Sequence, residues 1–323
     1  MTARDEFLAI VNPAAGGGRC GKLARSVLER LRADGVRLTS VETEGPGHAV
    51  EIVREALVRG YRRFLAVGGD GTSFEIVNGI FSVSPAVPHP QAGRGEASAT
   101  SLPSQHLTER PVLGFLPLGT GNSFLRDFSH RGLDHALEAI RLGRTRPCDV
   151  LRLIHSDGAI HFINLLSMGF PADVAALVNR RFKPLGEVGY LLGVLVCLAR
   201  LSRRPFPLRL DGEPEPQRDP CLFLSFNNSK FTGGKMMIAP YAEVADGLIE
   251  YVRWGPIGRI GLLRNLPGLY DGTHIEHPLA ARRAVRWVEF ELDEPVTIMV
   301  DGEVMTLRCQ RLEVLPSSLL VLV

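Results

Sequence analysis

Three short segments of the chain combine glycines with polar side chains that could bind phosphate. The first, "LAVGGDGTSFEIVNG", places Asp70 and Thr72 among glycines directly after an apolar run; these glycines are Gly68, Gly69 and Gly71. Glycine lets backbone N–H groups approach phosphate oxygens, and the start of a following helix favours negative charge. A carboxylate in such a cradle repels phosphate unless a cation or a transferable proton lies between them. Asp70 therefore indicates phosphate chemistry that uses a metal ion such as Mg²⁺.

The second segment, "VNPAAGGGRCGK", follows the first apolar run and almost matches a P-loop. Four residues separate Gly16 from Gly21 and Lys22 comes next, but Leu23 stands where a Ser or Thr would hold Mg²⁺. The segment is therefore not a P-loop (Walker A motif), because the residue that would bind Mg²⁺ is missing. What remains is a second glycine-rich loop suited to phosphate, with Asn12 at the end of the preceding strand.

The third segment, "PLGTGNS", adds Thr120 and Asn122 after another apolar run. Ligands of open parallel sheets bind at the carboxyl ends of the strands. If the three apolar runs are strands of one parallel sheet, the three loops lie at the same edge. We therefore predict a single phosphate site built from all three segments.

The first 150 residues contain the elements that such a site needs. Short apolar runs alternate with segments whose apolar residues recur at helical spacing and end near a glycine. The runs cover residues 7–11, 36–41, 63–67 and the stretch from 112, and the helical segments cover 22–33 and 49–60. This order predicts an α/β N-terminal domain, residues 1–150, with a parallel sheet covered by helices.

Residues 82–110 interrupt this pattern with a stretch rich in Pro, Ser, Ala and Gly. It has few large apolar side chains to offset the entropy of ordering, so we expect a disordered surface insertion. A regulatory segment is the alternative.

From residue 151 onward the sequence changes to short β-prone pieces separated by turn residues. Examples are "HFINLL", "CLFLSFNN", "LIEYVRW" and "VTIMVDGEV". They predict a second domain, residues 151–323, that is a mainly antiparallel β-sandwich interrupted by a helix near residues 186–202. The last strand could return to the first domain, and the active site should lie between the two domains.

Composition excludes several classes of protein. The chain has 37 Lys and Arg residues against 35 acidic residues, so its charge gives no general reason to expect nucleic acid as a partner. Its five cysteines are scattered without a CxxC pair, which argues against disulfides or a zinc site and favours a reducing cytoplasm. The start of the chain lacks the pattern of a signal peptide.

The longest apolar run, "YLLGVLVCLARL", is too short to span a bilayer. A buried helix and a lipid-facing helix are both compatible with it, and nearby Arg200, Arg203 and Arg204 would suit anionic headgroups. His274 and His277 could be metal ligands, but no third candidate accompanies them, so we expect surface or packing histidines. Two basic clusters are interpreted as solvated faces, with a membrane role as the alternative: Arg180, Arg181 and Lys183, and Arg282, Arg283 and Arg286.

Taken together, the sequence resembles the diacylglycerol kinase catalytic family, which includes sphingosine kinases and YegS-like lipid kinases. The resemblance depends on the order and spacing of motifs along nearly the whole chain: "NPAAGGG", Thr43 with His48 and Ala49, "GGDGT", "PLGTGN", "TGGKMMIAP", "DGL" and "DGE". It implies a two-domain fold like that of NAD kinases and diacylglycerol kinases. Related NAD kinases share the "GGDGT" loop. This motif alone therefore does not identify the substrate.

The resemblance, together with the loops themselves, implies where ATP and Mg²⁺ bind. The expected ATP site comprises Asn12, Pro13, Ala14, Ala15, Gly16, Thr43, Gly68, Gly69, Asp70, Gly71, Thr72, Glu75, Thr120 and Asn122. A structural Mg²⁺ would be held by the Asp246 carboxylate with the backbone carbonyls of Glu243 and Leu248, since Mg²⁺ prefers oxygen ligands. Asp70 would organise the end of the site that holds Mg²⁺ and ATP.

The "VDGE" segment would supply catalytic carboxylates from the second domain. Glu303 is the family's proton acceptor and Asp301 lies beside it in sequence, but the division of roles between them stays open. One departure from the family is Ser123, where many bacterial diacylglycerol kinases carry Asp after "GTGN". The contact that this Asp makes to the structural metal through a water molecule is therefore either missing here or made by another residue.

These observations predict an ATP-dependent lipid kinase that transfers the γ-phosphoryl group to a lipid hydroxyl, with diacylglycerol or a sphingoid base as acceptor. We expect it in the cytoplasm with peripheral association to the membrane that presents its lipid substrate, and a homodimer stays open. One alternative is a soluble NAD kinase, although its typical "PTGSTAY"-like segment is missing. The other is a catalytically silent lipid-binding module.

Overall fold

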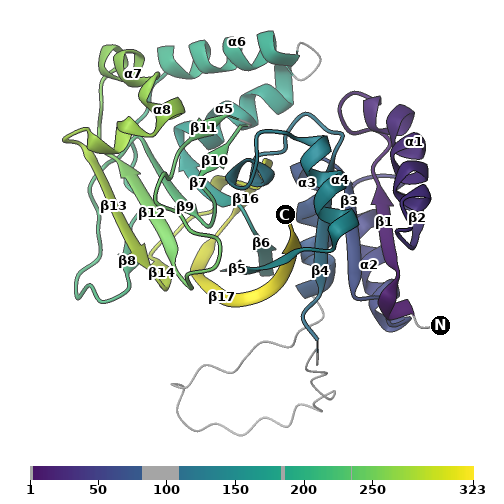
Figure 1. The fold of residues 1–323 in the computed structure, drawn as a ribbon. Helices are drawn as coiled ribbons and strands as arrows, with labels where there is room; N and C mark the ends of the chain where they lie inside the picture. Colours follow the sequence, from purple (N-terminus) through teal and green to yellow (C-terminus); the bar gives the residue numbers. More distant parts are fainter. Residues whose placement is uncertain (1–2, 82–108, 183–185, 234) are drawn as a thin grey trace, which may run out of the picture.

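The computed structural model describes residues 3–81, 109–182, 186–233 and 235–323. Figure 1 shows two lobes side by side, with the purple and blue elements in one lobe and the green elements in the other. The insertion predicted at residues 82–110 lies almost entirely outside the described residues.

The first lobe contains four parallel strands in the order β2 (Leu38–Glu42), β1 (Phe7–Val11), β3 (Arg63–Gly68) and β4 (Val112–Pro117). Every residue of β1 is buried, as expected for a parallel strand with helices on both faces. The carboxyl ends of β1, β3 and β4 therefore lie next to one another at one edge of the sheet.

The described residues of this lobe form the helices α1 (Arg19–Ala33), α2 (His48–Val58), α3 (Asp70–Phe81) and α4 (Leu133–Leu142). Short 3-10 turns are η1 (Ala3–Asp5) and η2 (Phe124–Asp127). The helices predicted over residues 22–33 and 49–60 form, and α1 begins three residues earlier, directly after the glycine loop.

The second lobe contains a six-stranded sheet in the order β13, β12, β9, β7, β15 and β16, in which all pairs are antiparallel. Its strands are β13 (Ala280–Val285), β12 (Ile249–Trp254), β9 (Phe223–Asn227), β7 (Leu165–Gly169), β15 (Val296–Val300) and β16 (Glu303–Leu307). A small hairpin pairs β10 (Phe231–Thr232) with β11 (Met236–Met237).

One long strand, β17 (Cys309–Leu322), connects the two lobes. It pairs in parallel with β4 and antiparallel with β5 (Thr145–His155) and β14 (Trp287–Phe290). The strands β8 (Leu208–Leu210) and β6 (Gly158–Phe162) extend the same nine-stranded sheet. The predicted fold class is confirmed: an α/β lobe with a mostly parallel sheet is followed by an antiparallel β-sandwich.

Helices line one edge of the second lobe in Figure 1. They are α5 (Phe170–Leu177), η3 (Val178–Phe182), α6 (Gly186–Ala199), α7 (Arg259–Asn265), α8 (Gly268–Asp271) and η5 (Thr273–Glu276). In the part of the chain that the structure describes, no helix is long and apolar enough to cross a membrane.

Candidate active site

The glycine loops of the first and third segments, "GGDG" and "PLGTGNS", pack backbone against backbone. The N–H of Gly119 donates to the carbonyl of Gly68 at 2.7 Å, and the N–H of Asp70 donates to the carbonyl of Gly121 at 3.0 Å. A Cβ on Gly119 would lie 2.7 Å from the Cα of Gly69, so a side chain there would push the loops apart. The two loops predicted to share one site are in direct contact.

The glycine loop of the second segment, "VNPAAGGGRCGK", joins the same cluster through Arg19. Its guanidinium donates to the carbonyls of Leu118 at 3.3 Å and Gly119 at 3.0 Å. Three consecutive glycines with positive φ precede it: Gly16, Gly17 and Gly18. Within the described residues, the N–H groups of Gly16 and Gly17 donate to no protein oxygen, so both are available to an anion. Sequence reasoning missed Arg19, although a basic residue directly after glycines was a usable signal.

Asp70 is the first residue of α3 and is bonded to the third loop. Both of its carboxylate oxygens accept the N–H of Ser123, at 3.1 Å each. Burial raises the pKa of Asp70 to about 6, although hydrogen bonds from Ser123 and Phe124 lower it. Ser123 thus holds the Asp70 carboxylate in place by hydrogen bonds from its backbone N–H.

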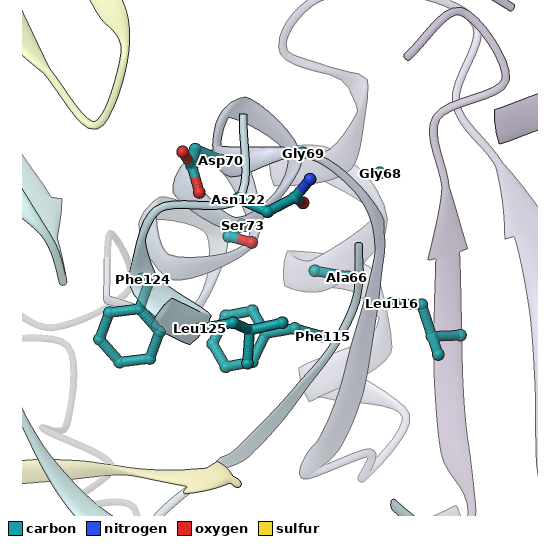
Figure 2. A pocket seen from close by; sticks show the side chains of 10 residues that line it. All are labelled: Ala66, Gly68, Gly69, Asp70, Ser73, Phe115, Leu116, Asn122, Phe124 and Leu125. Atoms are coloured by element: carbon teal, nitrogen blue, oxygen red, sulfur yellow. The ribbon is translucent and has the colours of Figure 1, made fainter. Parts of the chain in front are cut away.

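Figure 2 shows Asp70 and Asn122 close together where these loops meet, with Phe115 and Phe124 beneath them in the view. The two aromatic rings have centroids 5.2 Å apart. The space enclosed among these residues is only about 10 Å³, enough for about one water molecule. The loops are therefore close-packed here, and the space among these residues holds no ligand larger than water.

The second lobe brings Glu303 to these loops. Glu303 begins β16 and is exposed. A Cβ built on Gly71 would lie 2.6 Å from Glu303 Oε1, so the carboxylate lies directly beside the start of α3. Gly71 and Glu303, which are 232 positions apart in sequence, thus lie next to each other where the two lobes meet. The glycine loop of the first lobe faces an exposed carboxylate of the second lobe.

Asp301 has different surroundings from Glu303. Asp301 and Gly302 form the two-residue turn between β15 and β16, and both have positive φ, 47° and 90°. The buried Asp301 carboxylate accepts N–H groups of Ile163, Asn164 and Leu165 at 2.9–3.2 Å. Burial raises its pKa to about 7, and the charge of Asp70 adds to this rise.

Other predicted site residues lie on the same loops, and two of them form hydrogen bonds with the backbone of their own loop. Asn12 Oδ1 accepts the N–H of Ala14 at 3.1 Å, and Asn122 donates to the carbonyl of Gly119 at 3.1 Å. Thr120 is exposed at the tip of its loop. Thr72 Oγ1 is buried beside Gly68 and has no hydrogen-bond partner among the described residues.

Thr43 and Glu75 lie at the neighbouring strand and helix. The N–H of Thr43 donates to the carbonyl of Val11 at 2.8 Å. The Glu75 carboxylate accepts the N–H groups of Gly47 at 2.9 Å and Ala49 at 3.1 Å. Glu75 therefore caps the start of α2, a positioning contact that its place in the motif did not reveal.

The predicted metal loop at residues 243–248 is anchored by Asp149, a buried residue that sequence reasoning missed. Its carboxylate accepts the N–H of Gly247 at 2.7 Å and that of Ser317 at 2.6 Å. The sequence marked Asp149 only as a charged residue inside an apolar strand. Burial raises the pKa of Asp246, and the charges of Asp149 and Glu243 add to the effect.

This excess negative charge fits a divalent cation. Among the described residues, no three His, Cys, Asp or Glu side chains converge as a metal cluster. A cation at Asp246 would therefore need backbone carbonyls as further ligands, and the set of Asp246, Glu243 and Leu248 stays a prediction. The acidic residues Asp70 and Asp301, whose pKa values are both raised, likewise fit a cation that arrives with a nucleotide.

His274 is a packing residue. It is buried, and its two ring nitrogens bond the carbonyls of Gly268 and Ile238 at 3.1 Å each. His277 contacts the ring of Trp254 instead, with centroids 6.0 Å apart. The five cysteines are free.

An open groove of about 450 Å³ begins one residue after Glu303. Helix α5 and the β15–β16 hairpin form its walls, which are lined by Asp173, Ala176, Leu177, Arg180, Thr297, Val304, Met305 and Thr306. Asp173 is bonded to the guanidinium of Arg204 at 2.6 and 2.8 Å. The groove offers apolar and polar surface next to the start of β16.

Comparison with known proteins agrees with this geometry. Residues 6–153 match the model of the diacylglycerol kinase catalytic domain, and residues 164–323 match that of the YegS C-terminal NAD kinase beta sandwich-like domain. A probable lipid kinase YegS-like protein of Pseudomonas aeruginosa is 30% identical over 322 residues, covering 98% of this chain and 94% of that protein. The chain belongs to the diacylglycerol kinase and YegS-like lipid kinase family. The resemblance inferred from the motifs is confirmed.

Further members of the lipid kinase family match over similar lengths. A diacylglycerol kinase of Mycobacterium tuberculosis is 27% identical over 318 residues, covering 97% of this chain and 94% of that protein. A crystal structure of a putative diacylglycerol kinase from Bacillus anthracis has the same fold, with a TM-score of 0.74 at 21% identity. That similarity covers 100% of this chain and 96% of the other.

Proposed function

We propose that this chain transfers the γ-phosphoryl group of ATP to a lipid hydroxyl, such as that of diacylglycerol or a sphingoid base. The observation that carries the proposal is the position of Glu303 Oε1 against Gly71. An exposed carboxylate beside the start of a glycine loop is suited to accept a proton from a hydroxyl that attacks phosphate.

The remaining residues would bind and orient the reactants. The free N–H groups of Gly16 and Gly17, the positive charge of Arg19 and the start of α3 would hold phosphate oxygens. Mg²⁺ bound with ATP neutralises charge on the transferred group. The negative charges of Asp70 and Asp301 would favour that cation.

The groove beside Glu303 would hold the lipid acceptor. Its mixed lining would contact both a polar headgroup and the beginning of an acyl chain. Asp301 would act as a positioning residue, because its carboxylate bonds three backbone N–H groups. At the predicted metal loop, Mg²⁺ bound to Asp246 with the carbonyls of Glu243 and Leu248 would hold the loop in place.

The test is phosphoryl transfer by the purified full chain. ATP labelled at its γ-phosphate and Mg²⁺ would be incubated with diacylglycerol, monoacylglycerol, sphingosine, ceramide or phosphatidylglycerol, and the products separated by thin-layer chromatography. We expect Glu303→Gln to lower kcat by about 10²- to 10⁴-fold, the usual loss for a positioned general base, with unchanged melting temperature. Glu294→Gln is the matched control, since Glu294 is exposed just before β15.

Other outcomes would reject the proposal. Label found only in a soluble nucleotide, with NAD supplied, would assign an NAD kinase. Lipid binding without any transfer would assign a silent binding module. Near-normal turnover by Glu303→Gln would remove Glu303 from the proposed chemistry.

A further inference from the structure

The described part of helix α6, residues 192–199, has apolar residues on both its inner and its outer side. The 14 residues of α6 contain a single charged residue in their sequence. On the inner side, Gly193 allows close contact with α5 and η3, since a Cβ there would lie 2.5 Å from Val178 Cγ2. On the outer side, Leu192 and Leu195 are 38% and 49% exposed. A helix that is apolar all round is normally buried on all sides.

Helix α7 continues this apolar surface. Ile260 and Leu263, three residues apart, are 68% and 48% exposed. Arg259 at its start donates to the carbonyls of Leu198 at 3.1 Å and Ala199 at 2.9 Å, which joins α7 to the end of α6. Figure 1 shows both helices along one edge of the second lobe. We call Leu192, Leu195, Ile260 and Leu263 the docking face.

The segments that carry the docking face are rich in basic residues. Residues 174–210 and 255–270 contain nine Lys and Arg residues and one acidic residue, whereas the whole chain is nearly balanced at 37 against 35. Several of these arginines are exposed: Arg180, Arg181, Arg200, Arg203, Arg259 and Arg264. None of these six takes part in an ion pair between described residues.

The other arginine cluster, at residues 282–286, differs in this respect. Arg282 pairs with Glu250 and lies over the ring of Tyr241, and Arg283 pairs with Glu213 at 2.6 Å. Its charge is therefore partly neutralised within the protein. The six exposed arginines of the α6–α7 edge, in contrast, have no acidic partner among the described residues.

We propose that the docking face binds the surface of an anionic lipid bilayer. Apolar side chains would enter the acyl boundary while the arginines contact lipid phosphates. Helix α6 is only about 21 Å long, so it would lie in the plane of the interface and not cross it. The biological purpose of this docking depends on the proposed function, but the docking itself does not.

The position of α5 connects the docking face to the proposed acceptor groove. Helix α5 packs against α6 on one side, through Val174 and Val178 of the following turn near Gly193. It also lines the groove beside Glu303 through Ala176 and Leu177. A bilayer on the outer side of α6 would lie about two helix layers from the groove, each roughly 8–10 Å thick.

Vesicle sedimentation without ATP tests the apolar contribution. Full-length protein would be mixed with vesicles of phosphatidylcholine alone or with an equal amount of phosphatidylglycerol. We expect Leu195→Glu and Leu263→Glu each to weaken binding to the mixed vesicles by about tenfold, because each removes a leucine from the lipid. Leu142→Glu is the matched control: Leu142 on α4 is 47% exposed, close to the 49% and 48% of the two tested leucines.

The charge contribution is tested with Arg200→Gln and Arg264→Gln. We expect each to weaken binding to the mixed vesicles by about fivefold at low salt, and by less at high salt. Arg25→Gln and Arg141→Gln, exposed on α1 and α4, are the controls. Hydrogen exchange of the unmodified protein should slow across residues 192–195 and 260–263 when mixed vesicles are added, which checks the face without any substitution.

Three results would overturn the proposal. The first is equal vesicle binding by the unmodified protein and Leu195→Glu. The second is a loss of vesicle binding in the Leu142→Glu control that equals the loss in Leu195→Glu and Leu263→Glu. The third is a dimer in solution that Leu195→Glu disrupts while vesicles bind no protein, which would assign the face to a second copy of the chain. A different result would reject the proposed function alone. In that case the unmodified protein binds vesicles but does not phosphorylate a short-chain acceptor dispersed in detergent.

Discussion

At the scale of single residues, the two carboxylates of the "VDGE" segment have different surroundings. Three backbone N–H groups bond Asp301, and it is buried, whereas Glu303 is exposed beside Gly71. The bonds to Asp301 fix the turn that begins β16, so they also fix the position of Glu303. We therefore assign Asp301 a positioning role and propose Glu303 as the base.

The raised pKa of Asp301, about 7, predicts how stability changes with pH. An unfolded Asp has a pKa near 3.9, so between about pH 4 and pH 7 the folded chain binds more protons at this site than the unfolded chain. The contribution of Asp301 to the free energy of unfolding therefore falls as pH rises through this window.

Asp301→Asn removes this titration, while Asn tolerates the positive φ of the turn. We expect the stability of the variant relative to the unmodified protein to increase from about pH 4 to pH 7, in urea unfolding without Mg²⁺ or ATP. The matched control is Asp293→Asn, because Asp293 is exposed. A difference that stays constant across this range would contradict the assigned pKa.

At the scale of elements, the site depends on how closely the start of α3 meets the start of β16. A Cβ on Gly71 would lie 2.6 Å from Glu303 Oε1, so this glycine leaves the space in which the carboxylate lies. The contact involves the end of a flexible side chain and no backbone atom. An added methyl group would therefore displace Glu303 without forcing the two elements apart.

We expect Gly71→Ala to lower kcat by about 10- to 100-fold, because a misplacement of about 1 Å can cost this much. The melting temperature should stay equal or rise, since Ala favours the first turn of a helix over Gly. Lipid phosphorylation and thermal unfolding measure the two effects. Gly45→Ala is the control, because a Cβ there meets no atom within 4 Å; a drop in stability without loss of activity would contradict the assignment.

At the scale of the whole molecule, β17 makes the two lobes parts of one sheet. Leu320 and Val321 pair with Val112 and Leu113 of β4, while earlier residues of β17 pair with β5 and β14. Leu322, near the end of the strand, is buried in the core of the first lobe. Without β17 the first lobe would lose both a strand and part of its core.

The lobes should therefore unfold together. Both tryptophans, Trp254 and Trp287, lie in the second lobe, so their fluorescence reports that lobe, whereas helical circular dichroism includes the helices of both lobes. We expect coincident urea transitions by the two probes, and a parallel shift in Leu322→Ala, which should lose about 2–5 kcal/mol. Leu142→Ala is the exposed control. Two separate transitions would contradict the coupling.

Much of the fold and part of the site could be predicted from local sequence. The strands at residues 7–11 and 63–67 and the helices at residues 22–33 and 49–60 agree with the sequence prediction within a few residues, because apolar periodicity and glycines act locally. The hairpin at Asp301 and Gly302 was read as one strand, although "DG" is a usual signal for a two-residue turn. Strand β13, with sequence "AARRAV", was missed because its exposed edge residues show no alternation.

The sequence by itself determined the three glycine loops, the order of the elements and the family, because these depend on residue types at short spacing. Only the tertiary structure decided that Glu303 lies against Gly71, that Glu75 caps α2 and that Asp301 is bonded by three backbone N–H groups. It also brought α6 and α7 together with their exposed leucines. Such contacts join residues far apart in the chain, and their distances follow from the packing of whole elements, which no local pattern encodes.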